Sequence, residues 1–326
     1  MTSWSSDFSL TVLSEMGCGM RQNDLNVFIM DNIDLDKEER NGKRPVISEE
    51  NLTVVSSKRP KEEEENFRKN EISKMKDITN DVEATFVVFE ASFIPKYSDV
   101  GRWYHLKSPF GDIEFDVHIY SAVTITPTVL IGFNNSGNIK VWPSEECLAY
   151  YLLKHESLVQ SKTILELGSG MVGLSGLTSA ALGASEVVLT DGNEKSVENI
   201  RRIIEMNKLS NHVTCCVLSW NIPIPNKQFD VILCADCLFF TEEHCALLNC
   251  TYQHLKPGGI AYITAPDRNG TARTFLDLVY KERKRWQSVS VNFHIENEAE
   301  IYSKLKMQNC NIRLEIPMFL ILKKMA

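Results

Sequence analysis

The sequence predicts a doubly wound, Rossmann-like α/β fold with an antiparallel β extension on its N-terminal side. Three observations support this expectation. A turn from Gly168 to Gly173 lies between an apolar strand and a helix, strand-like and helix-like segments alternate after His155, and the run 229–235 is almost wholly apolar. Such a run is typical of a central parallel strand, which helices cover on both faces. With 326 residues, 43% of them hydrophobic, the chain can form one large α/β domain with an appendage, or two modest domains.

The pattern changes twice along the chain, which divides it into three expected parts. Residues 1–80 carry runs of mixed charge and little periodicity, so we expect a largely disordered leader. Residues 81–141 are rich in β-branched and aromatic residues and alternate strictly from Ile113 to Ile119, so we expect a β-rich extension. Residues 142–326 carry the alternating strands and helices of the main domain.

Short apolar runs predict the strands of the extension. These strands are expected over residues 85–94, 112–120, 128–133 and 139–142, with a turn at 134–138. Trp142 and Pro143 should end the last of them. Ser144 is then expected to cap a helix over 145–155, whose first turn holds two glutamates near the positive end of the helix dipole.

The main domain is expected to follow the right-handed order of a doubly wound sheet. The predicted strands cover 163–167, 186–190, 212–218, 229–235, 258–264, 288–293 and 313–324. The predicted helices cover 173–183, 194–207, 241–255 and 271–286, with one more between the last two strands. Pro317 should make the last strand irregular or place it near an edge. A ligand of such a sheet binds beyond the carboxyl ends of the strands, where strand order reverses.

The composition limits the classes of partner and compartment. The net charge of −8 disfavours a nucleic-acid-binding protein, because such proteins usually show a basic surface. No apolar run reaches the roughly 18 residues that a membrane helix needs. The first ten residues lack the basic region of a signal peptide. Nine cysteines without a regular spacing indicate reduced thiols, so we expect a protein of the cytoplasm or the nucleus.

Four of the cysteines raise the question of a zinc site. Cys234 and Cys237 form C-x-x-C, and Cys245 and Cys250 follow. Zinc knuckles usually lie in turns with glycine and polar residues, whereas Cys234 ends an apolar run. We therefore expect these side chains to be small buried apolar groups, with no metal.

The glycine-rich turn predicts a nucleotide-like ligand. Gly168, Gly170 and Gly173 spell G-x-G-x-x-G after the first parallel strand, and glycine lets the backbone approach a ligand closely. Asp191 ends the second strand, where a carboxylate can accept both ribose hydroxyls of an adenosine. Trp220 follows the third strand and can lie against an adenine or simply pack. The simpler alternative for the motif is an ordinary tight turn between a strand and a helix.

These residues fit both NAD and S-adenosylmethionine. Glu166, two residues before Gly168, favours the second ligand, because a carboxylate would repel the pyrophosphate of NAD and attract an ammonium or a sulfonium. Strands and helices account for nearly all of the chain after the loop, which leaves no separate substrate domain for an oxidoreductase. The run "LKPGG" at 255–259 and the two strands after it match a seven-stranded methyltransferase sheet.

Longer stretches carry a family resemblance. The runs "VWPSEECLAYYLLKH", "LELGSGMVGLSGL", "VVLTDGNEKSVENI", "LSW" and "FDVILCADCLF" resemble the seven-β-strand protein lysine methyltransferases. Within that group the chain most resembles the enzymes that methylate calmodulin, and the most particular matches are "WPSEE-LAYY-LKH", "LTDGNEK" and "CADCLF". The resemblance covers residues 84–326 and fades in the leader.

The resemblance implies S-adenosylmethionine as cosubstrate and suggests which residues bind it. Together with the charge argument for Glu166, the expected contacts are Trp142, Glu166, Gly168, Ser169, Gly170, Asp191, Trp220 and Ala235. The D-x-x-Y/F motif of the family matches Asp236 and Phe239, which are the candidate catalytic residues. Phenylalanine stands here in place of tyrosine, so a role for a phenol hydroxyl has no counterpart in this chain.

The implied reaction requires a lysine nitrogen with a lone pair, although the free pKa of lysine is near 10.4. Burial in a narrow channel and a nearby sulfonium charge both lower that pKa. We expect Asp236 to aim the ammonium through a hydrogen bond, while water takes the proton. Phe239, with Trp220 or another aromatic residue, is expected to line the channel and hold the cation. The alternative for Asp236 is a strand-end carboxylate that is satisfied inside the fold.

The sequence thus predicts a protein-lysine N-methyltransferase that acts on calmodulin as a monomer, without nucleic acid or membrane. An acidic chain needs a local basic surface to bind an acidic partner, and residues 280–286 or Arg201 and Arg202 are candidates. The alternatives are a lysine of another protein, a non-catalytic module that binds cofactor or a partner, and an oxidoreductase. Methylation of a nucleic-acid amino group is disfavoured, because "ADCLFF" lacks the prolines of an N/D-P-P-Y/F loop.

Overall fold

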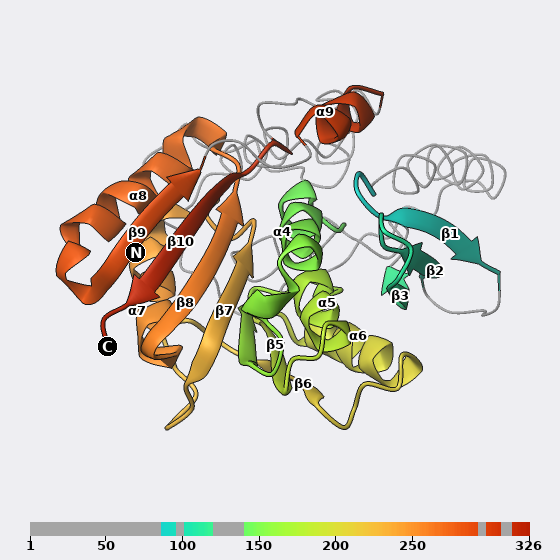
Figure 1. Ribbon diagram of the computed structural model, residues 1–326, viewed down its shortest axis with the longest axis horizontal. Helices are drawn as coiled ribbons and strands as arrows, with labels where there is room; N and C mark the ends of the chain where they lie inside the picture. Colours follow the sequence, from blue (N-terminus) through green and yellow to red (C-terminus); the bar gives the residue numbers. More distant parts are fainter. Residues whose placement is uncertain (1–85, 96–100, 120–139, 293–297, 308–314) are drawn as a thin grey trace, which may run out of the picture.

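The structure confirms the predicted fold class. The computed structural model describes residues 86–95, 101–119, 140–292, 298–307 and 315–326. A seven-stranded sheet forms the centre, helices cover both of its faces, and a three-stranded sheet lies to one side (Figure 1). The predicted leader over 1–80, the strand over 128–133 and the turn over 134–138 lie outside the described residues.

The large sheet has the strand order β6-β5-β4-β7-β8-β10-β9. Its strands are β4 Thr163–Leu167, β5 Glu186–Asp191, β6 Val213–Val217, β7 Phe229–Ala235, β8 Leu255–Ala265, β9 Trp286–Asn292 and β10 Met318–Lys324. Strands β4 to β8 are parallel, whereas β10 runs antiparallel to both β8 and β9. Strand order reverses between β4 and β7, so the carboxyl ends of the parallel strands offer a ligand site there.

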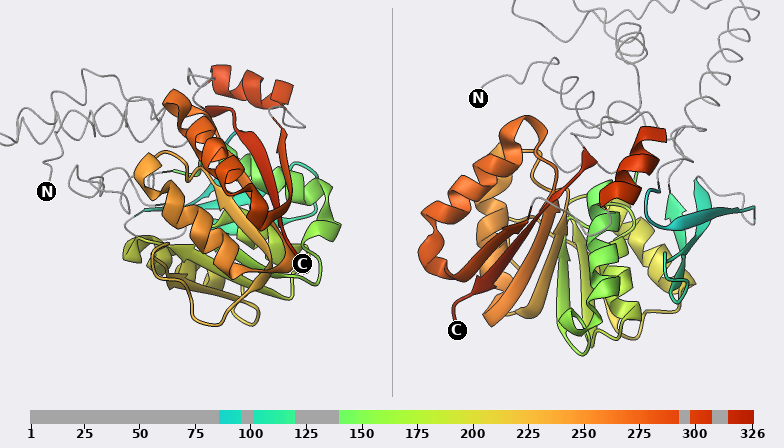
Figure 2. Two further views of the ribbon diagram at one scale, coloured as in Figure 1. Left: turned by 90° about the vertical axis from the view of Figure 1, so that its left-hand side faces the viewer. Right: turned by 45° about the horizontal axis from the view of Figure 1, so that its top comes forward.

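Helices cover the two faces of this sheet. They are α4 Pro143–Lys154, α5 Leu174–Ala181, α6 Glu194–Met206, α7 His244–His254, α8 Thr271–Lys281 and α9 Glu298–Met307. Helices α7 and α8 cover one face, and α4, α5 and α6 cover the other (Figure 2). Because successive strand residues point to opposite faces, Ile232 packs beneath α7 and α8 while Leu233 packs beneath α4 and α5. No helix in the described ranges is long and apolar enough to cross a bilayer.

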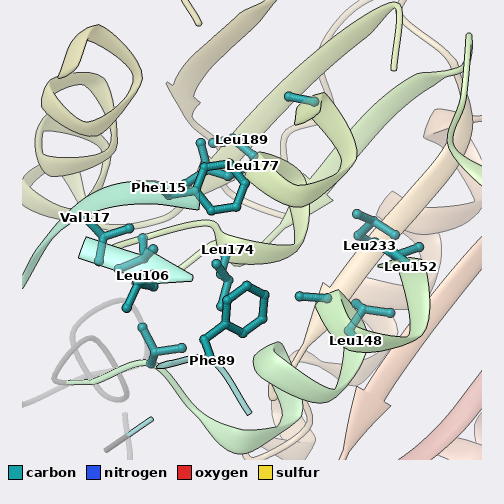
Figure 3. Packing of buried hydrophobic residues seen from close by; sticks show 14 of the residues in the cluster. Phe89, Leu106, Phe115, Val117, Leu148, Leu152, Leu174, Leu177, Leu189 and Leu233 are labelled. Atoms are coloured by element: carbon teal, nitrogen blue, oxygen red, sulfur yellow. The ribbon is translucent and has the colours of Figure 1, made fainter. Parts of the chain in front are cut away.

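The extension forms three antiparallel strands, β1 Glu90–Ile94, β2 Arg102–Lys107 and β3 Glu114–Ile119. Its buried side chains join the hydrophobic core that α4 to α6 share with the large sheet. Figure 3 shows Phe115 of β3 next to Leu177 of α5 and Leu189 of β5. Apolar burial of this kind is the main force that holds packed elements together, so the small sheet is anchored to the main domain.

Asn199 of α6 and Asn207, which directly follows this helix, hold the outer edge of β3. Asn207 accepts the backbone N–H of Asp116 at 2.9 Å and donates to the carbonyl of the same residue at 2.7 Å, as a neighbouring strand would. Asn199 donates to the His118 carbonyl at 2.8 Å, and its side-chain oxygen lies 2.5 Å from His118 Nδ1. Because unpaired backbone groups in a packed edge are costly, these amides fix the position of the small sheet against α6.

Glu146 joins α4 to the segment before β1. Its buried carboxylate accepts three consecutive backbone N–H groups, from Val87 at 2.7 Å and from Val88 and Phe89 at 2.8 Å each. Burial raises the pKa of this carboxyl to about 7, against the three hydrogen bonds, which act to lower it. The segment expected as the start of a strand is therefore held by a side chain instead of a strand ladder.

The structure corrects the sequence prediction at the junction of the two sheets. Residues 140–142, which were expected within a strand, form none, and α4 begins at Pro143. Ser144 does not cap the helix, because Trp142 is the N-cap residue and makes no side-chain capping bond. Pro143 suits the first helical position, since it has no N–H to leave unpaired and its φ is already helical.

Two strand predictions also differ from the structure. Strand β2 was not predicted, although its buried side chains include Trp103 and Leu106. Pro317 was expected to make the last strand irregular or to place it near an edge. Strand β10 is indeed second from the edge of the sheet, and its register with β9 shifts between Lys323 and Lys324, but Pro317 itself lies outside the strand. Pro317 precedes β10, which pairs with strands on both sides, and so it removes no bond from the ladder.

Candidate functional site

The carboxyl ends of four parallel strands bring the candidate residues to one edge of the large sheet. The glycine loop 168–173 follows β4, and Asp191 ends β5. Residues 235–240 lie at the end of β7, and residues 266–270 follow β8. This is the edge at which strand order reverses, as the sequence predicted for a ligand site.

The glycine loop has a backbone that glycine adopts far more easily than other residues. Gly168, Gly170 and Gly173 have φ angles of +67°, +58° and +69°. Gly168 is also tightly enclosed, because a Cβ there would lie 2.4 Å from Cys237 Sγ and 3.6 Å from Trp220 Cζ2. The loop therefore needs glycine for its backbone and for its packing, and it lies next to Trp220.

Asp191 is bonded directly to this loop. Its Oδ2 accepts the backbone N–H of Gly170 at 2.9 Å, and its Oδ1 accepts that of Asn193 at 2.8 Å. A carboxylate can accept about four hydrogen bonds, so these bonds are compatible with an additional hydroxyl donor. The structure thus joins the two main elements of the predicted adenosine site, while the ligand contact itself stays a prediction.

Glu166 and Ser169 lie beneath the loop. Glu166 is 1% exposed, and its Oε2 accepts the Ser169 hydroxyl and the Gly176 N–H, each at 3.2 Å. Burial raises the pKa of Glu166 to about 7, so its charge at neutral pH is only partial. Both side chains shape the loop from inside the fold. A partly neutral Glu166 repels a pyrophosphate less than a full carboxylate charge would, and direct ligand contacts of Glu166 and Ser169 stay predictions.

From the sequence, Glu145 was expected only in the first turn of a helix. In the structure its side chain also lies against the glycine loop. Its Oε1 accepts the N–H of Leu174 at 2.5 Å, and its carbonyl accepts the Ser175 hydroxyl at 3.2 Å. Burial, and then the nearby charge of Glu166, raise the pKa of Glu145 well above its usual value. The start of α4 is thereby fixed to the start of α5, directly after the glycine loop.

Asp236 has a strained backbone and a carboxylate that accepts three hydrogen bonds. Its φ is +56°, which is uncommon for a residue other than glycine, and the residue is 6% exposed. Arg268 Nη1 donates to Oδ1, Arg268 Nη2 donates to Oδ2 at 3.0 Å, and the Ser144 hydroxyl donates to Oδ2 at 3.1 Å. Asp236 is thus a satisfied carboxylate in this structure, the alternative that the sequence left open, and it is also placed at the predicted edge.

An ion cluster surrounds this carboxylate, and the sequence gave no signal for it. Arg268 Nη2 lies 3.8 Å from Glu315 Oε2, and Lys140 Nζ lies 3.5 Å from Glu315 Oε1. The Trp142 ring lies under both cations, with its centroid 4.4 Å from Lys140 Nζ and 5.1 Å from Arg268 Cζ. Burial raises the pKa of Glu315 to about 7, although both cations act to lower it. The cluster connects Trp142 to Asp236 through Arg268.

The remaining predicted residues lie at the end of β7. Ala235 ends the strand, and its carbonyl accepts from Cys237 Sγ at 3.3 Å. Phe239 is half-buried, and its ring centroid lies 5.0 Å from that of Phe240. An aromatic pair therefore follows Asp236 at the site edge. A contact of Phe239 with a substrate lysine stays a prediction.

The cysteines of the C-x-x-C run pack inside the fold. Cys234, Cys237 and Cys250 are buried in the core beneath α7 and α8, whereas Cys245 is exposed. A hydrogen bond with Cys234, and then burial, raise the pKa of the Cys237 thiol well above its usual value. Within the described ranges, no three His, Cys, Asp or Glu side chains gather as a metal site would require.

Comparison with known families identifies a match over the central part of the chain. Residues 132–282 match a family model described as lysine methyltransferase. This segment contains the glycine loop, Asp191, Asp236 and Arg268. The match agrees with the enzyme class expected from the sequence.

Curated relatives share this segment. A calmodulin-lysine N-methyltransferase of Arabidopsis thaliana is 42% identical over 118 residues, which cover 34% of this chain and 38% of the relative. A protein-lysine N-methyltransferase of Chaetomium thermophilum is 30% identical over 185 residues, which cover 52% and 54%. A human histone-arginine methyltransferase is 36% identical over 111 residues, which cover 32% and 56%. The chain thus spans between 38% and 56% of the length of these relatives.

Solved structures with a similar chain path include further methyltransferases. A putative SAM-dependent methyltransferase from Streptococcus mutans has a TM-score of 0.47 at 13% identity, covering 71% of this chain and 57% of that one. A methyltransferase from Pyrococcus furiosus has a TM-score of 0.41 at 21% identity, covering 56% and 84%.

Proposed function

We propose that this chain transfers methyl groups from S-adenosylmethionine to a lysine side chain of a protein, and that this protein is calmodulin. One observation carries the proposal: the glycine loop bonded to Asp191 and the buried Asp236 lie at a single sheet edge, within the segment that matches the lysine methyltransferase model. The same edge therefore offers a place for an adenosine and a carboxylate for a lysine cation.

The residues at this edge fit S-adenosylmethionine. The loop at Gly168 and Gly170 lets the backbone approach a ligand without a Cβ. Asp191 is placed to accept the ribose hydroxyls, and Trp220, next to Gly168, to lie against the adenine. S-adenosylmethionine supplies an electrophilic methyl group on a sulfonium.

The chain's own contribution to the reaction is to orient and desolvate the lysine. Asp236 is the acceptor that aims the lysine ammonium, and Phe239 and Phe240 offer aromatic faces to a cation at the same edge. A site shielded from water favours the neutral amine, because desolvation lowers the pKa of a lysine. Holding amine and methyl donor in line converts the encounter into an intramolecular step, which supplies much of the rate.

Two observations support calmodulin as the substrate. The runs "LTDGNEK" and "CADCLF" resemble those of enzymes that methylate calmodulin, and the chain is similar to the Arabidopsis calmodulin-lysine N-methyltransferase. An acidic substrate requires a local basic surface on an acidic chain. The turn Arg283–Arg285 after α8 supplies three consecutive basic residues, none of them buried. We assign calmodulin docking to this turn.

The proposal is tested by incubating the protein with labelled S-adenosylmethionine and recombinant, unmethylated calmodulin, followed by mass spectrometry. A mass increase on one calmodulin lysine is expected. Asp191→Asn serves as the comparison at the cosubstrate side, and Asp236→Asn at the lysine side. The substrate assignment would be contradicted if calmodulin gained no label while the protein bound S-adenosylmethionine and labelled another protein.

A lysine of another protein is the second candidate. It is favoured by the similarity to the Chaetomium protein-lysine N-methyltransferase, which extends over more of this chain than the calmodulin-lysine relative does. Labelling of a cell lysate under the same conditions distinguishes the two. A single labelled band other than calmodulin would support this alternative, and cosubstrate binding without any labelled protein would support a non-catalytic module.

A further inference from the structure

Three of the about four acceptor positions of the Asp236 carboxylate are already taken by residues of the fold. Both of its oxygens accept hydrogen bonds from Arg268, and Oδ2 also accepts from Ser144. Arg268 is itself 5% exposed, so its guanidinium already fills the place of a cation beside Asp236. A second cation would meet an occupied carboxylate and a like charge.

Glu315 lies beside Arg268 as an incompletely paired carboxylate. It is 0% exposed, and within the described ranges neither of its oxygens has a hydrogen bond of ordinary length. Among the described residues, its cationic neighbours are Arg268 Nη2 at 3.8 Å and Lys140 Nζ at 3.5 Å. These distances are those of ion pairs and exceed the 2.7–3.2 Å of a good N–H···O bond. A buried carboxylate without such bonds is costly, so it is prepared to accept a donor.

We propose that Glu315 is a positioning residue that takes over the Arg268 guanidinium when the substrate lysine binds Asp236. The inference rests on the proposed function, since it requires a lysine that approaches Asp236. In this exchange Arg268 leaves Asp236 for Glu315, and the lysine ammonium takes the vacated acceptor. Asp236 then faces the lysine ammonium, and Glu315 faces the Arg268 guanidinium at hydrogen-bond distance in addition to Lys140.

The surroundings suit such an exchange. The Trp142 ring lies 5.1 Å from Arg268 Cζ, so the guanidinium can keep an aromatic face beneath it while its partner changes. Lys140, over the same ring, lies 3.5 Å from Glu315 Oε1, while Arg268 faces Oε2. The Lys140 charge favours the ionised form of Glu315. Arg268 is therefore held between two acceptors, and the substrate decides which of them it bonds.

Steady-state kinetics of Glu315→Gln test the exchange. Glutamine keeps the size of the side chain but cannot draw the guanidinium from Asp236. We expect the KM for the protein substrate to rise by about tenfold or more, which corresponds to about 1.4 kcal/mol, with an unchanged Kd for S-adenosylmethionine. Glu315→Asp keeps the charge and should remain within about threefold of the wild-type KM. Glu186→Gln is the matched control, since it removes a carboxylate from the Lys227 ion pair at the opposite edge of the sheet.

A double variant separates the exchange from a general structural effect. In an Arg268→Gln background the competing cation is gone, so adding Glu315→Gln should no longer raise KM. A wild-type KM for Glu315→Gln, or an equal KM increase with and without Arg268, would overturn the exchange. If Glu315→Gln does not fold, side-chain NMR of labelled Arg268 in the wild-type protein replaces it, and an unchanged signal on saturation with substrate would overturn the exchange. No methyl transfer by the wild-type protein would overturn the proposed function itself, and the exchange with it.

Discussion

Replacing Gly168 with alanine should destabilise the fold and weaken cosubstrate binding together. Two separate costs arise at this position. The φ of +67° lies in the left-handed region, where an L-residue with a Cβ costs about 1–2 kcal/mol. The new Cβ would also lie 2.4 Å from Cys237 Sγ, and overpacking of a dense interior costs about 1–3 kcal/mol. The free energy of unfolding should therefore fall by about 2–5 kcal/mol.

A second glycine isolates the backbone cost. Gly258 has a φ of +76°, but a Cβ there would meet no heavy atom within 4 Å. Gly258→Ala should therefore cost only the conformational part, about 1–2 kcal/mol. Cys237→Ala in the Gly168→Ala background removes the colliding sulfur, so the double variant should be more stable than the sum of the two single effects by about 1–3 kcal/mol.

Urea unfolding of the four variants measures these differences, and calorimetric titration of S-adenosylmethionine measures the effect on the site. The affinity of Gly168→Ala should fall at a temperature where it is still folded, because the loop must shift to relieve the contact. The reasoning is refuted if Gly168→Ala costs no more than Gly258→Ala. It is also refuted if Cys237→Ala gives no favourable coupling with Gly168→Ala.

Glu146→Ala leaves the three backbone N–H groups of residues 87–89 without their acceptor and should lower the free energy of unfolding by about 1–3 kcal/mol. Hydrogen exchange should become faster for the amides of this segment alone. Unchanged exchange there would contradict the anchoring role of Glu146. Burial raises the folded-state pKa of Glu146, Glu166 and Glu315 to about 7, above the pKa of an unfolded glutamate. The stability that this difference contributes is complete below the unfolded pKa and is lost as pH rises through the folded pKa. Between pH 6.5 and pH 8 the free energy of unfolding should therefore fall by an amount on the order of 1 kcal/mol in denaturation experiments, and a rise would refute the assignment. Asp191→Asn should raise the Kd for S-adenosylmethionine by about 10–100-fold in a calorimetric titration, because hydrogen bonds to a charged group contribute about 1.5–3 kcal/mol. An unchanged Kd would show that Asp191 does not bind the cosubstrate.

The parts of the fold that sequence reasoning predicted are those with a strong local pattern. The apolar run 229–235 and the amphipathic helix from Glu194 have one dominant period each, and both were found within a residue or two of their expected bounds. The glycine loop and Asp191 were placed at one edge because the order of strands and helices fixes where the carboxyl ends of parallel strands meet.

The parts that were missed depend on contacts between distant residues. Strand β2 is marked by no strict alternation, and it is stabilised by pairing with strands on both sides. The start of α4 depends on Pro143 and on the bond from Ser144 to Asp236, which is 92 residues away. Arg268 lies in a short turn after β8, and Glu315 lies just before β10. No period in the sequence connects such residues, so their charges could be paired only in three dimensions.

The proposed function requires that the edge formed by the glycine loop and Asp191 binds an adenosine whose other end is a sulfonium. Calorimetric titration of the full chain with S-adenosylmethionine and, separately, with NAD tests it most directly. We expect saturable binding of S-adenosylmethionine and no measurable heat with NAD. Binding of NAD without binding of S-adenosylmethionine would contradict it.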